Sequence, residues 1–214
     1  MTLQRLAIFG ASGHGKVVAD IAQSAGWQSV AFFDDAWPDA IQNGHWEIQG
    51  NTTTMLANLN QFDGAIVAIG NNEIRWQKQQ QILKREGLLA TIVHPSAIVS
   101  QYAEIGTGTV IMPNAVINAY ATVGDACIIN TGAIIEHDCI IGNAVHIAPS
   151  ATLCGNTSVG ELSWFGVGAT SRQGSKIGSN ATIGAGAVVI KEVADGETVI
   201  GCPAKPIEQT SDKD

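Results

Sequence analysis

The sequence predicts an α/β domain followed by a parallel β-helix. A large apolar residue returns at every sixth position from Val93 to Val189, and Ser171 is the one polar residue among these seventeen positions. Glycine is abundant, with 24 residues, whereas charged residues make up only 14% of the chain. Before residue 93, short apolar runs that end in glycine or polar residues alternate with helical patterns. These three observations predict a solenoid of short strands and corners after a smaller α/β layer.

A period of six fits neither an α-helix nor a simple alternating strand, so the repeating unit is a short strand plus a tight corner. Three hexads would form one triangular coil of about eighteen residues, giving about five coils stacked roughly 4.8 Å apart. We expect the aliphatic residue to fill the interior, and the small residue two positions before it and the glycine after it to allow the corner. These glycines are Gly106, Gly124, Gly142, Gly160, Gly178 and Gly184. The pattern resembles the hexapeptide-transferase prism, and from that resemblance we expect a left-handed coil, an exception to the usual crossover rule.

The composition argues against several classes of protein. Nineteen acidic and eleven basic residues give a net charge of −8, which argues against nucleic acid as a partner. The four cysteines show no C-x-x-C spacing, and two of them occupy small-residue positions of the repeat, so we expect reduced thiols in a cytosolic protein. The first residues lead straight into a strand, with no basic leader or long apolar run. We therefore predict a cytoplasmic protein with no secretory signal and no membrane span.

A glycine-rich turn follows the first predicted strand, at residues 6–9. The turn reads Gly10-Ala11-Ser12-Gly13-His14-Gly15, and a helical pattern begins at Lys16. Backbone N–H groups at such a helix start suit a phosphate or a hydroxyl-rich ligand. The spacing is G-x-x-G-x-G and not the G-x-G-x-x-G of dinucleotide sites, which argues against a nicotinamide cofactor. A plain tight turn in a structural layer is the alternative.

The later α/β elements repeat this arrangement. A strand at 29–33 ends in Asp34 and Asp35, and a strand at 65–69 ends in Gly70-Asn71-Asn72 before a long helix at 73–85. Residues 37–50 look irregular, and residues 52–59 read as a short helix with a threonine cap. Because the ends of parallel strands meet at one edge of a sheet, a Rossmann-like domain would gather these groups into a binding site. The expected substrate-binding residues are Ser12, Gly13, His14, Asp34, Asp35, Gly70 and Asn71. For the two aspartates, a solvated strand end is the alternative.

The domain boundary is expected near residue 93. A last strand at 90–93 runs into His94-Pro95, where proline ends the sheet. We therefore divide the chain into a Rossmann-like domain at 1–92, a β-helix domain at 93–206 and a polar tail at 207–214. After Val189, residues 191–206 are expected to form a rigid exit from the prism.

Ionisable side chains are densest in the β-helix at Glu136-His137-Asp138. Histidine suits a general base near neutral pH, and a neighbouring carboxylate fixes its tautomer and raises its basicity. A solvated corner is the alternative. A metal site made of His137, Asp138, Cys139 and His146 is disfavoured, because consecutive residues on a strand point to opposite faces. We predict no metal.

The repeat also predicts which residues meet. Gly155 comes eighteen residues after His137 and should lie one coil directly above it, with an uncovered backbone where a reacting group can approach. His146 is nine residues after His137, about half a coil round, so a site that uses both histidines must lie between two prisms. Three prisms packed about a threefold axis would form three such clefts, which favours a homotrimer.

The basic residues indicate the shape of a ligand. Between Val93 and Ser171 there is no lysine or arginine. The basic residues that follow are Arg172, Lys176 and Lys191, with Lys205 in the exit segment. Lys191 is fifty-four residues after His137, three coils or roughly 14 Å away. A ligand with its reactive end at His137 and its phosphates near the last coils would be long and thin, which is the shape of acyl-coenzyme A.

Several motifs together resemble the bacterial nucleotide-sugar acetyltransferases. They are Gly10-Ala11-Ser12-Gly13-His14-Gly15-Lys16-Val17-Val18, Asp34-Asp35, Ala68-Ile69-Gly70-Asn71-Asn72-Glu73-Ile74-Arg75, Glu136-His137-Asp138-Cys139-Ile140-Ile141-Gly142 and Gly201-Cys202-Pro203-Ala204-Lys205. The resemblance covers nearly the whole chain and is closest to the UDP-N-acetylbacillosamine N-acetyltransferases, with the sialic acid O-acetyltransferases as a related branch. The two halves together are specific, whereas hexads alone would indicate only an acyltransferase or a solenoid.

The resemblance implies a cytosolic homotrimer that uses acetyl-CoA as co-substrate and has no tightly bound cofactor. It would acetylate the 4-amino group of UDP-2-acetamido-4-amino-2,4,6-trideoxyglucose, with His137 as general base and Asp138 as the residue that raises its basicity. Close family members carry glutamate where this chain has Asp138. His146, Val167 and Ala185 match acetyl-CoA contacts, with Ala185 in place of a glycine, and the N-terminal set above matches the nucleotide-sugar contacts. The expected acetyl-CoA-binding residues are thus His146, Gly155, Val167, Ala185 and Lys191.

We expect direct transfer of the acetyl group. His137 would take a proton from the amine as it attacks the thioester carbonyl, while a backbone N–H near Gly155 stabilises the oxyanion. Cys139 occupies a small-residue position and is not expected to be a nucleophile. The alternatives are O-acetylation of sialic acid or another sugar by the same base, and a non-catalytic trimeric scaffold that binds a nucleotide sugar. An oxidoreductase is disfavoured by the glycine spacing.

Overall fold

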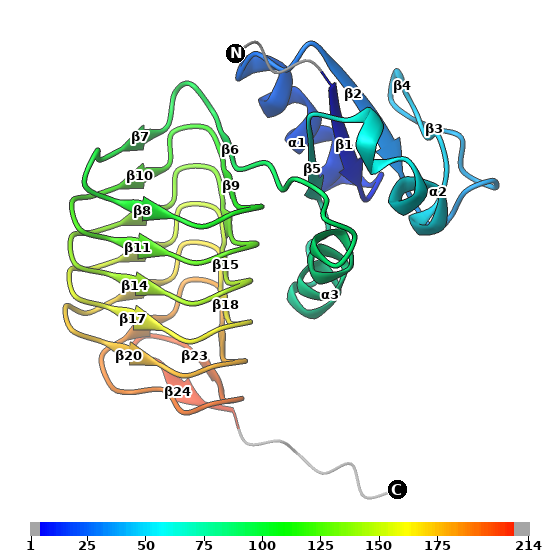
Figure 1. Ribbon diagram of the computed structural model, residues 1–214. Helices are drawn as coiled ribbons and strands as arrows, with labels where there is room; N and C mark the ends of the chain where they lie inside the picture. The colour runs from blue at the N-terminus through cyan, green and yellow to red at the C-terminus, as the bar shows by residue number, and fades with distance from the viewer. Residues whose placement is uncertain (1–4, 208–214) are drawn as a thin grey trace, which may run out of the picture.

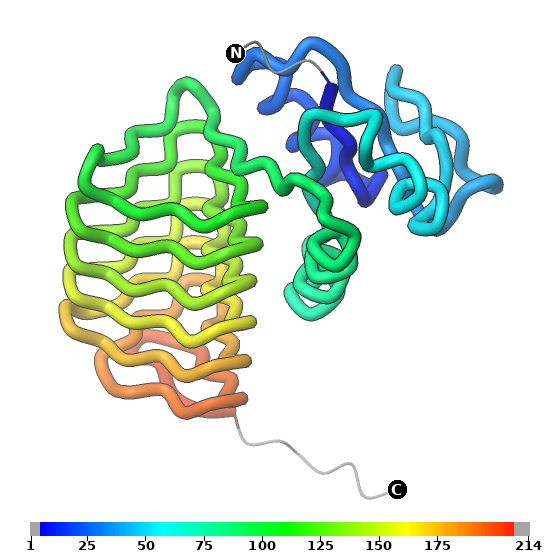
Figure 2. The backbone as a smooth tube through the Cα atoms, viewed as in Figure 1, coloured from blue at the N-terminus to red at the C-terminus, as the bar shows by residue number. Residues whose placement is uncertain are grey.

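The computed structural model describes residues 5–207 and places a small α/β domain beside a tall three-sided solenoid (Figure 1). The backbone trace in Figure 2 shows the solenoid coils stacked from the green first coil to the orange last one. Of the predicted tail at 207–214, all but the first residue lies outside the described part of the chain. The predicted fold class, an α/β domain followed by a β-helix, is confirmed.

The α/β domain is built on a parallel three-stranded sheet. Its central strand β1 (Arg5–Phe9) pairs with β2 (Ser29–Phe33) on one side and with β5 (Gly64–Val67) on the other. All of β5 and most of β1 and β2 are buried, because helices cover both faces. One face packs on α1 (Gly13–Ser24), and the opposite face packs on residues of α2 (Thr52–Ala57) and α3 (Asn72–Leu83). A 3-10 turn, η1 (Leu59–Gln61), follows α2.

Two local predictions in this domain are wrong. Residues 37–50 are not wholly irregular, because β3 (Gln42–Asn43) and β4 (Trp46–Glu47) form a short antiparallel hairpin. The cap of α2 is Asn51 rather than a threonine, and its side-chain oxygen accepts a hydrogen bond from the Thr54 backbone at 3.1 Å. The Thr52 hydroxyl bonds Asp35 instead, so it is not available as a cap.

The predicted strand at 90–93 is divided between the two domains. Leu89 bridges to Ala65 of the α/β sheet, whereas β6 (Ile92–Val93) pairs with β9 (Val110–Ile111) of the solenoid. The backbone therefore leaves one sheet and enters the other between residues 89 and 92. This change of pairing partner lies next to the boundary predicted at residue 93.

The solenoid has three sheets, one on each face, and their strands are parallel except for the last strand of the first sheet, which is antiparallel. The first contains β6, β9 (Val110–Ile111), β12 (Ile128–Ile129), β15 (His146–Ile147), β18 (Trp164–Phe165), β21 (Thr182–Ile183), β23 (Thr198–Ile200) and β24 (Lys205–Pro206). The second contains β7 (Ile98–Val99), β10 (Val116–Ile117), β13 (Ile134–Ile135), β16 (Thr152–Leu153), β19 (Thr170–Ser171) and β22 (Val188–Val189). The third contains β8 (Glu104–Ile105), β11 (Thr122–Val123), β14 (Ile140–Ile141), β17 (Ser158–Val159) and β20 (Lys176–Ile177). Hereafter these are the first, second and third sheets.

The stack has six coils on its second sheet rather than the predicted five or so. All six of these strands lie within the predicted hexads. After Val189 the chain continues inside the stack instead of leaving it, and it adds one more rung at Val193 and at β23. Val193 bridges to Ile177 and Val199 pairs with Ile183, so each partner is sixteen residues away instead of eighteen. Because this coil is two residues short, the six-residue period breaks there although its valines are still buried.

The interior of the prism is filled as predicted. From Ile111 on, the aliphatic series and the small residues two positions before it form one buried core, which includes Ala133, Ile135, Cys139 and Ile141. Val93, at the start of the series, is exposed. The exceptional Ser171 is buried, and its hydroxyl meets Thr157 Oγ1 at 2.9 Å and the Cys154 N–H at 3.1 Å. The polar side chain is therefore satisfied inside an apolar prism.

The glycines after the aliphatic residues have a different role from the predicted one. The left-handed backbone conformation lies three residues after the aliphatic position, as at Asn114, Tyr120 and Asp138, and not at these glycines. A Cβ on Gly106, Gly124, Gly142, Gly160 or Gly178 would instead clash with backbone of the next coil. These residues are glycine because neighbouring coils approach closely at one edge of the prism.

Candidate active site

His137 and Asp138 lie at the corner between the second and third sheets, after β13. His137 Nδ1 is 2.7 Å from Asp138 Oδ2, and both side chains are more than half exposed. The two side chains meet because they belong to a corner rather than a strand, and Asp138 has a φ of 60°. Aspartate and asparagine are among the few non-glycine residues that tolerate this left-handed backbone conformation. The shorter carboxylate of Asp138 thus reaches the imidazole and favours the tautomer with a proton on Nδ1.

Gly155 lies one coil from His137, as predicted from the repeat. The coils are in register through the pairing of Ile135 with Leu153. A Cβ on Gly155 would lie 2.6 Å from both Nε2 and Cε1 of His137, so the imidazole rests on bare backbone. The other ring nitrogen of His137 therefore sits beside an uncovered backbone surface, where a substrate can approach it.

Cys139 is a poor candidate for a nucleophile. It is fully buried in the prism, and desolvation raises the pKa of its thiol. Its Sγ lies 3.4 Å from the carbonyl oxygen of Cys154, inside the coil. Since the thiolate is the reactive form, both its burial and its pKa disfavour covalent catalysis there.

Three of the basic residues predicted to bind phosphate lie around one hollow. A pocket of about 190 Å³ is lined by Arg172, Lys176 and Lys191, among others. Lys191 follows β22 as His137 follows β13, and these strands are three rungs apart in the second sheet. The predicted three-coil separation is confirmed, and His137, Gly155 and Lys191 share one corner of the prism.

A second pocket, of about 380 Å³, lies between the two domains. It is lined by Gly70, Asn71, Asn72, His146 and Trp164. Gly70 and Asn71 precede α3 and Asn72 is its first residue, whereas His146 and Trp164 are outward-facing residues of β15 and β18. The structure thus brings two predicted substrate-binding residues together with one predicted acetyl-CoA contact, and we call this space the interdomain pocket.

The pKa values of His146 and His14 are strongly lowered. Burial lowers the pKa of His146 to about 3, helped by the positive charge of Arg75 and by His14. Burial, helped by Arg75, likewise lowers the pKa of His14 to about 4. His146 Nε2 lies 3.0 Å from Asn130 Nδ2, whereas His14 Nε2 is buried with no partner among residues 5–207. Both imidazoles are therefore neutral near pH 7.

Stability is expected to decrease as the pH falls from about 6.5 toward 4. In the unfolded chain both histidines take up protons near their ordinary pKa of 6.5, whereas the folded protein holds them neutral down to about 4 and 3. The unfolded state then binds more protons, which lowers the free energy of unfolding. Melting midpoints measured across this range should fall less in His146→Asn, which cannot titrate, than in the wild type. Equal falls in both proteins would contradict the assignment.

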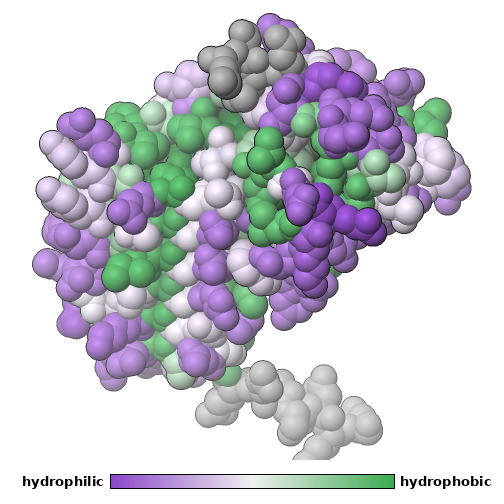
Figure 3. Space-filling model, viewed as in Figure 1, coloured by the Kyte–Doolittle hydropathy of each residue, from purple (hydrophilic) through white to green (hydrophobic). Residues whose placement is uncertain are grey.

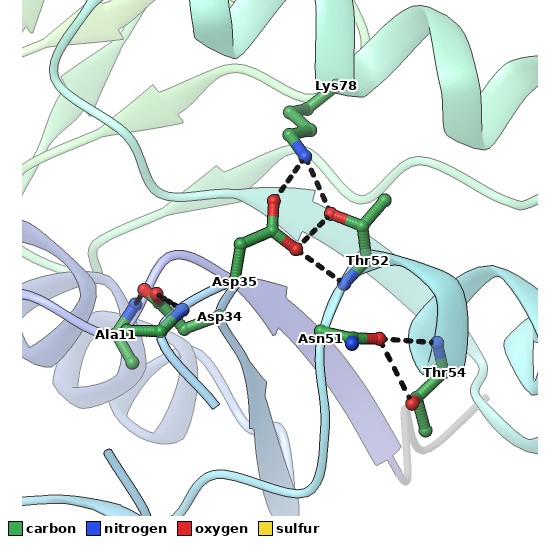
Figure 4. A network of polar contacts seen from close by, with 8 residues as sticks. Ala11, Asp34, Asp35, Asn51, Thr52, Thr54 and Lys78 are labelled. Atoms are coloured by element: carbon green, nitrogen blue, oxygen red, sulfur yellow. Dashed lines mark hydrogen bonds and ion pairs between the residues drawn. The ribbon is translucent and has the colours of Figure 1, made fainter. Parts of the chain in front are cut away.

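Asp34 and Asp35 are held by groups of the chain itself (Figure 4). Asp34 accepts hydrogen bonds from the backbones of Ala11 at 2.7 Å and Ala36 at 2.9 Å, which fastens the glycine-rich turn to the end of β2. Asp35 accepts from Thr52 and forms a 2.7 Å ion pair with Lys78 of α3. These contacts lower the pKa of Asp35 against the opposing effect of its partial burial, which by itself would raise it.

The glycine-rich turn is partly structural. Gly10 has a φ of 108°, and a Cβ on Gly15 would clash with the Gly10 carbonyl. Gly13 is different, because a Cβ there would meet no atom within 4 Å. Ser12 precedes α1, and its side chain makes no capping hydrogen bond. Ser12 and Gly13 therefore face open space at a helix N-terminus.

Val167 and Ala185 lie at a different corner from His137. They follow β18 and β21 of the first sheet, and the backbone of Gly186 bonds the Val167 carbonyl one coil away at 2.8 Å. Both are exposed. The residues predicted to bind acetyl-CoA therefore lie at three places in one chain. Gly155 and Lys191 are at the His137 corner, Val167 and Ala185 at the other corner, and His146 in the interdomain pocket.

The predictions missed three residues of the interdomain region, namely Asn72, Arg75 and Trp164. Asn72 and Arg75 lie within the family-like motif, but nothing in their spacing indicates that they face the solenoid. Trp164 is 44% exposed in an outward position of the repeat, with its ring 6.3 Å from that of His146. A large aromatic residue at an outward position is the one signal that would have suggested a binding surface.

The four residues considered for a metal site are not gathered together. Cys139 points into the prism, and His146 lies on the first sheet, away from the corner that carries His137 and Asp138. Across residues 5–207, no three histidine, cysteine or acidic side chains form a group that would hold a metal ion. In the same part of the chain, every helix is too short or too polar to cross a membrane.

Comparison with known proteins agrees with this geometry. Residues 5–82 match the family model of the PglD N-terminal domain. A UDP-N-acetylbacillosamine N-acetyltransferase of Bacillus subtilis is 39% identical over 109 residues, which is half of this chain and half of that relative.

Solved structures match over almost the whole chain. The acetyltransferase domain of PglB from Neisseria gonorrhoeae is 42% identical, with a TM-score of 0.90 over 95% of this chain and 99% of that one. The same domain in complex with acetyl coenzyme A matches with a TM-score of 0.89, 41% identity and coverage of 95% and 98%. PerB from Caulobacter crescentus, in complex with CoA and GDP-perosamine, is 35% identical with a TM-score of 0.89 over 95% of this chain and 97% of that one. The chain therefore belongs to the nucleotide-sugar acetyltransferases, a family of acetyl-CoA-dependent acyltransferases with a hexapeptide-repeat solenoid.

Proposed function

We propose that this protein transfers the acetyl group of acetyl-CoA to the 4-amino group of UDP-2-acetamido-4-amino-2,4,6-trideoxyglucose, giving UDP-N,N′-diacetylbacillosamine. The observation that carries the proposal is the His137 imidazole, whose Nδ1 is bonded to Asp138 and whose Nε2 faces the bare backbone of Gly155. The identity of the sugar is supported by the Bacillus subtilis relative. GDP-perosamine is a second candidate acceptor, because it occupies the related PerB structure.

In the proposed reaction, His137 acts as the general base. Its Nε2 takes a proton from the acceptor amine as the nitrogen attacks the thioester carbonyl carbon. The new C–N bond forms, the C–S bond breaks, and coenzyme A leaves as a thiolate that takes the proton from the His137 imidazolium, which restores the base. Asp138 stabilises the imidazolium that forms on His137, and a backbone N–H near Gly155 stabilises the oxyanion.

Acetyl-CoA is proposed to lie along the corner that carries His137. Its thioester would sit at His137 and Gly155. Its phosphates would lie near Arg172 and Lys176, two rungs away, and Lys191, three rungs away. A cluster of cations there offsets the repulsion between an anionic ligand and a chain of net charge −8. The orientation follows from the absence of lysine and arginine between Val93 and Ser171.

The nucleotide sugar is proposed to bind the α/β domain. Its phosphates would approach the N-terminus of α1 at Ser12 and Gly13, which faces open space. Its sugar would reach the interdomain pocket at Gly70 and Asn71, opposite His146, the predicted acetyl-CoA contact. The remaining members of the predicted set, His14, Asp34 and Asp35, shape the strand ends beside these groups.

A homotrimer is proposed to complete the site. Within one chain, His137 lies at one corner, and Val167 and Ala185 lie at another, so one acetyl-CoA can contact all three only if a second copy supplies a corner. The solenoid surface in Figure 3 shows a column of hydrophobic residues running along the stack. Exposed apolar side chains on the described solenoid include Ile98, Tyr120 and Ile140, which suits burial against another copy.

The test of the proposed function is acetyl-CoA turnover, followed as release of free thiol. The acceptors are the UDP-amino sugar, GDP-perosamine and a sialic acid, in parallel reactions. We expect rapid thiol release with the UDP-amino sugar. Turnover only with GDP-perosamine would change the acceptor, and turnover only with sialic acid would indicate O-acetylation. If no acceptor supports turnover although the nucleotide sugar binds, the protein is a nucleotide-sugar-binding scaffold.

A further inference from the structure

Arg75 of α3 is buried between the two domains, with 1% of its surface exposed. On the solenoid side, its Nε donates to the Ala126 carbonyl at 2.6 Å and its Nη2 donates to the Ala144 carbonyl at 2.8 Å. These two carbonyls belong to successive coils, eighteen residues apart. One guanidinium therefore spans two coils of the solenoid.

The same guanidinium holds the turn into α3, formed by residues 70–72. Its Nη1 donates to the carbonyls of Ile69 at 2.9 Å and Gly70 at 3.2 Å, and its Nη2 donates to Asn72 Oδ1 at 2.8 Å. Asn72 in turn donates through its Nδ2 to the carbonyls of Leu162 at 2.9 Å and Ser163 at 3.1 Å. Through Arg75 and Asn72, the turn at 70–72 is hydrogen-bonded to three successive coils of the solenoid, next to Trp164.

This turn forms the wall of the interdomain pocket that faces His146 and Trp164. The guanidinium makes no ion pair with a carboxylate among residues 5–207, so its burial depends on carbonyl and amide oxygens that accept all the hydrogen bonds given above. Burial lowers the pKa of Arg75 to about 10, and it stays a cation near pH 7. A planar fork of five donors matches this set of acceptors, whereas the single ammonium of lysine does not.

We propose that Arg75 is a positioning residue for the acceptor sugar, because it fixes the Gly70–Asn72 turn at a set distance from His146 on the solenoid. The proposal rests on the proposed function, in which the interdomain pocket receives the sugar of the nucleotide-sugar acceptor. Arg75 acts through the turn and makes no contact with acetyl-CoA at the His137 corner. Its loss therefore affects the acceptor selectively.

Gln79 supplies a matched control on the same helix. It is also fully buried, and its Nε2 donates to the Thr107 carbonyl of the solenoid at 3.0 Å. None of its contacts reaches residues 70–72. Gln79→Met removes one contact between the domains without releasing the turn, so a general loss of domain docking appears in this variant as well.

The kinetic experiment compares Arg75→Lys and Gln79→Met in the trimeric or monomeric form that the wild type adopts. We expect Arg75→Lys to raise the KM for the amino-sugar acceptor about tenfold or more while the KM for acetyl-CoA stays within about twofold. Gln79→Met should leave both values near those of the wild type. Equal changes for the two substrates in Arg75→Lys, or the same acceptor effect in Gln79→Met, would overturn the proposal. If Arg75→Lys does not fold, Asn72→Ala replaces it, because this change removes the side-chain oxygen that accepts a hydrogen bond from Nη2 of Arg75. It should likewise raise the KM for the acceptor and leave the KM for acetyl-CoA unchanged.

Amide hydrogen exchange tests the proposal without any acceptor. In the free protein, Arg75→Lys should speed exchange across residues 70–74 and leave residues 107–111 unchanged, whereas Gln79→Met should do the reverse. If residues 70–74 of the Arg75→Lys variant exchanged at the same rates as in the wild type, the positioning role would be refuted. If no amino sugar supports turnover in the wild type, the proposed function fails while this measurement still decides whether Arg75 fixes the turn.

Discussion

Replacing His137 by alanine is expected to lower the rate of acetyl transfer by about 100- to 10,000-fold, the usual contribution of a general base. The reason is geometric, because His137 has one ring nitrogen held by Asp138 at 2.7 Å and the other beside the uncovered Gly155. The change should show in kcat of thiol release. Because the imidazole is more than half exposed, stability and affinity for the nucleotide sugar should be almost unchanged.

His94 provides the control for this substitution. It also follows a short strand of the solenoid, and its Nδ1 lies 2.8 Å from the Ser96 hydroxyl rather than a carboxylate. His94→Ala should keep the wild-type rate. Asp138→Asn should give an intermediate loss, because the amide can orient the imidazole but cannot stabilise the imidazolium by its charge. Full activity in His137→Ala would exclude His137 as the base.

Gly155→Ala is expected to lower kcat/KM by about 100-fold, although it adds a single methyl group. The new Cβ would lie 2.6 Å from Nε2 of His137, a distance that real contacts do not allow. The imidazole can swing outward because it is exposed, so the fold should survive while Nε2 leaves its place. Gly155 does not have a positive φ, and alanine is therefore free of backbone strain there.

The measurement is kcat/KM together with the melting midpoint. Gln101→Ala is the control, since Gln101 is exposed and follows β7 at the same corner, two rungs before His137 and away from the proposed acetyl-CoA path. It should alter neither quantity. If Gly155→Ala kept wild-type activity with the imidazole unmoved in a crystal structure, the stacking of His137 on Gly155 would be irrelevant to catalysis.

The sequence by itself determined the parts of the protein that depend on local periodicity. Because each coil repeats every eighteen residues, counting along the chain placed Gly155 against His137 and Lys191 three rungs away. The same counting predicted a buried position for Cys139. The counting failed after Val189. The coil there is two residues shorter than the others, so its valines stay inside the prism although the six-residue period is broken.

The tertiary structure alone decided how the two domains meet. Arg75 and Trp164 are far apart in sequence, and neither period nor motif indicates that an arginine on α3 would bond carbonyls of two solenoid coils. The role of the glycines after the aliphatic residues was also decided there, since the close approach of the next coil, and not local backbone conformation, requires them. A repeat encodes contacts between residues a fixed number of positions apart, whereas docking of separate domains depends on surfaces whose partners lie at no fixed spacing.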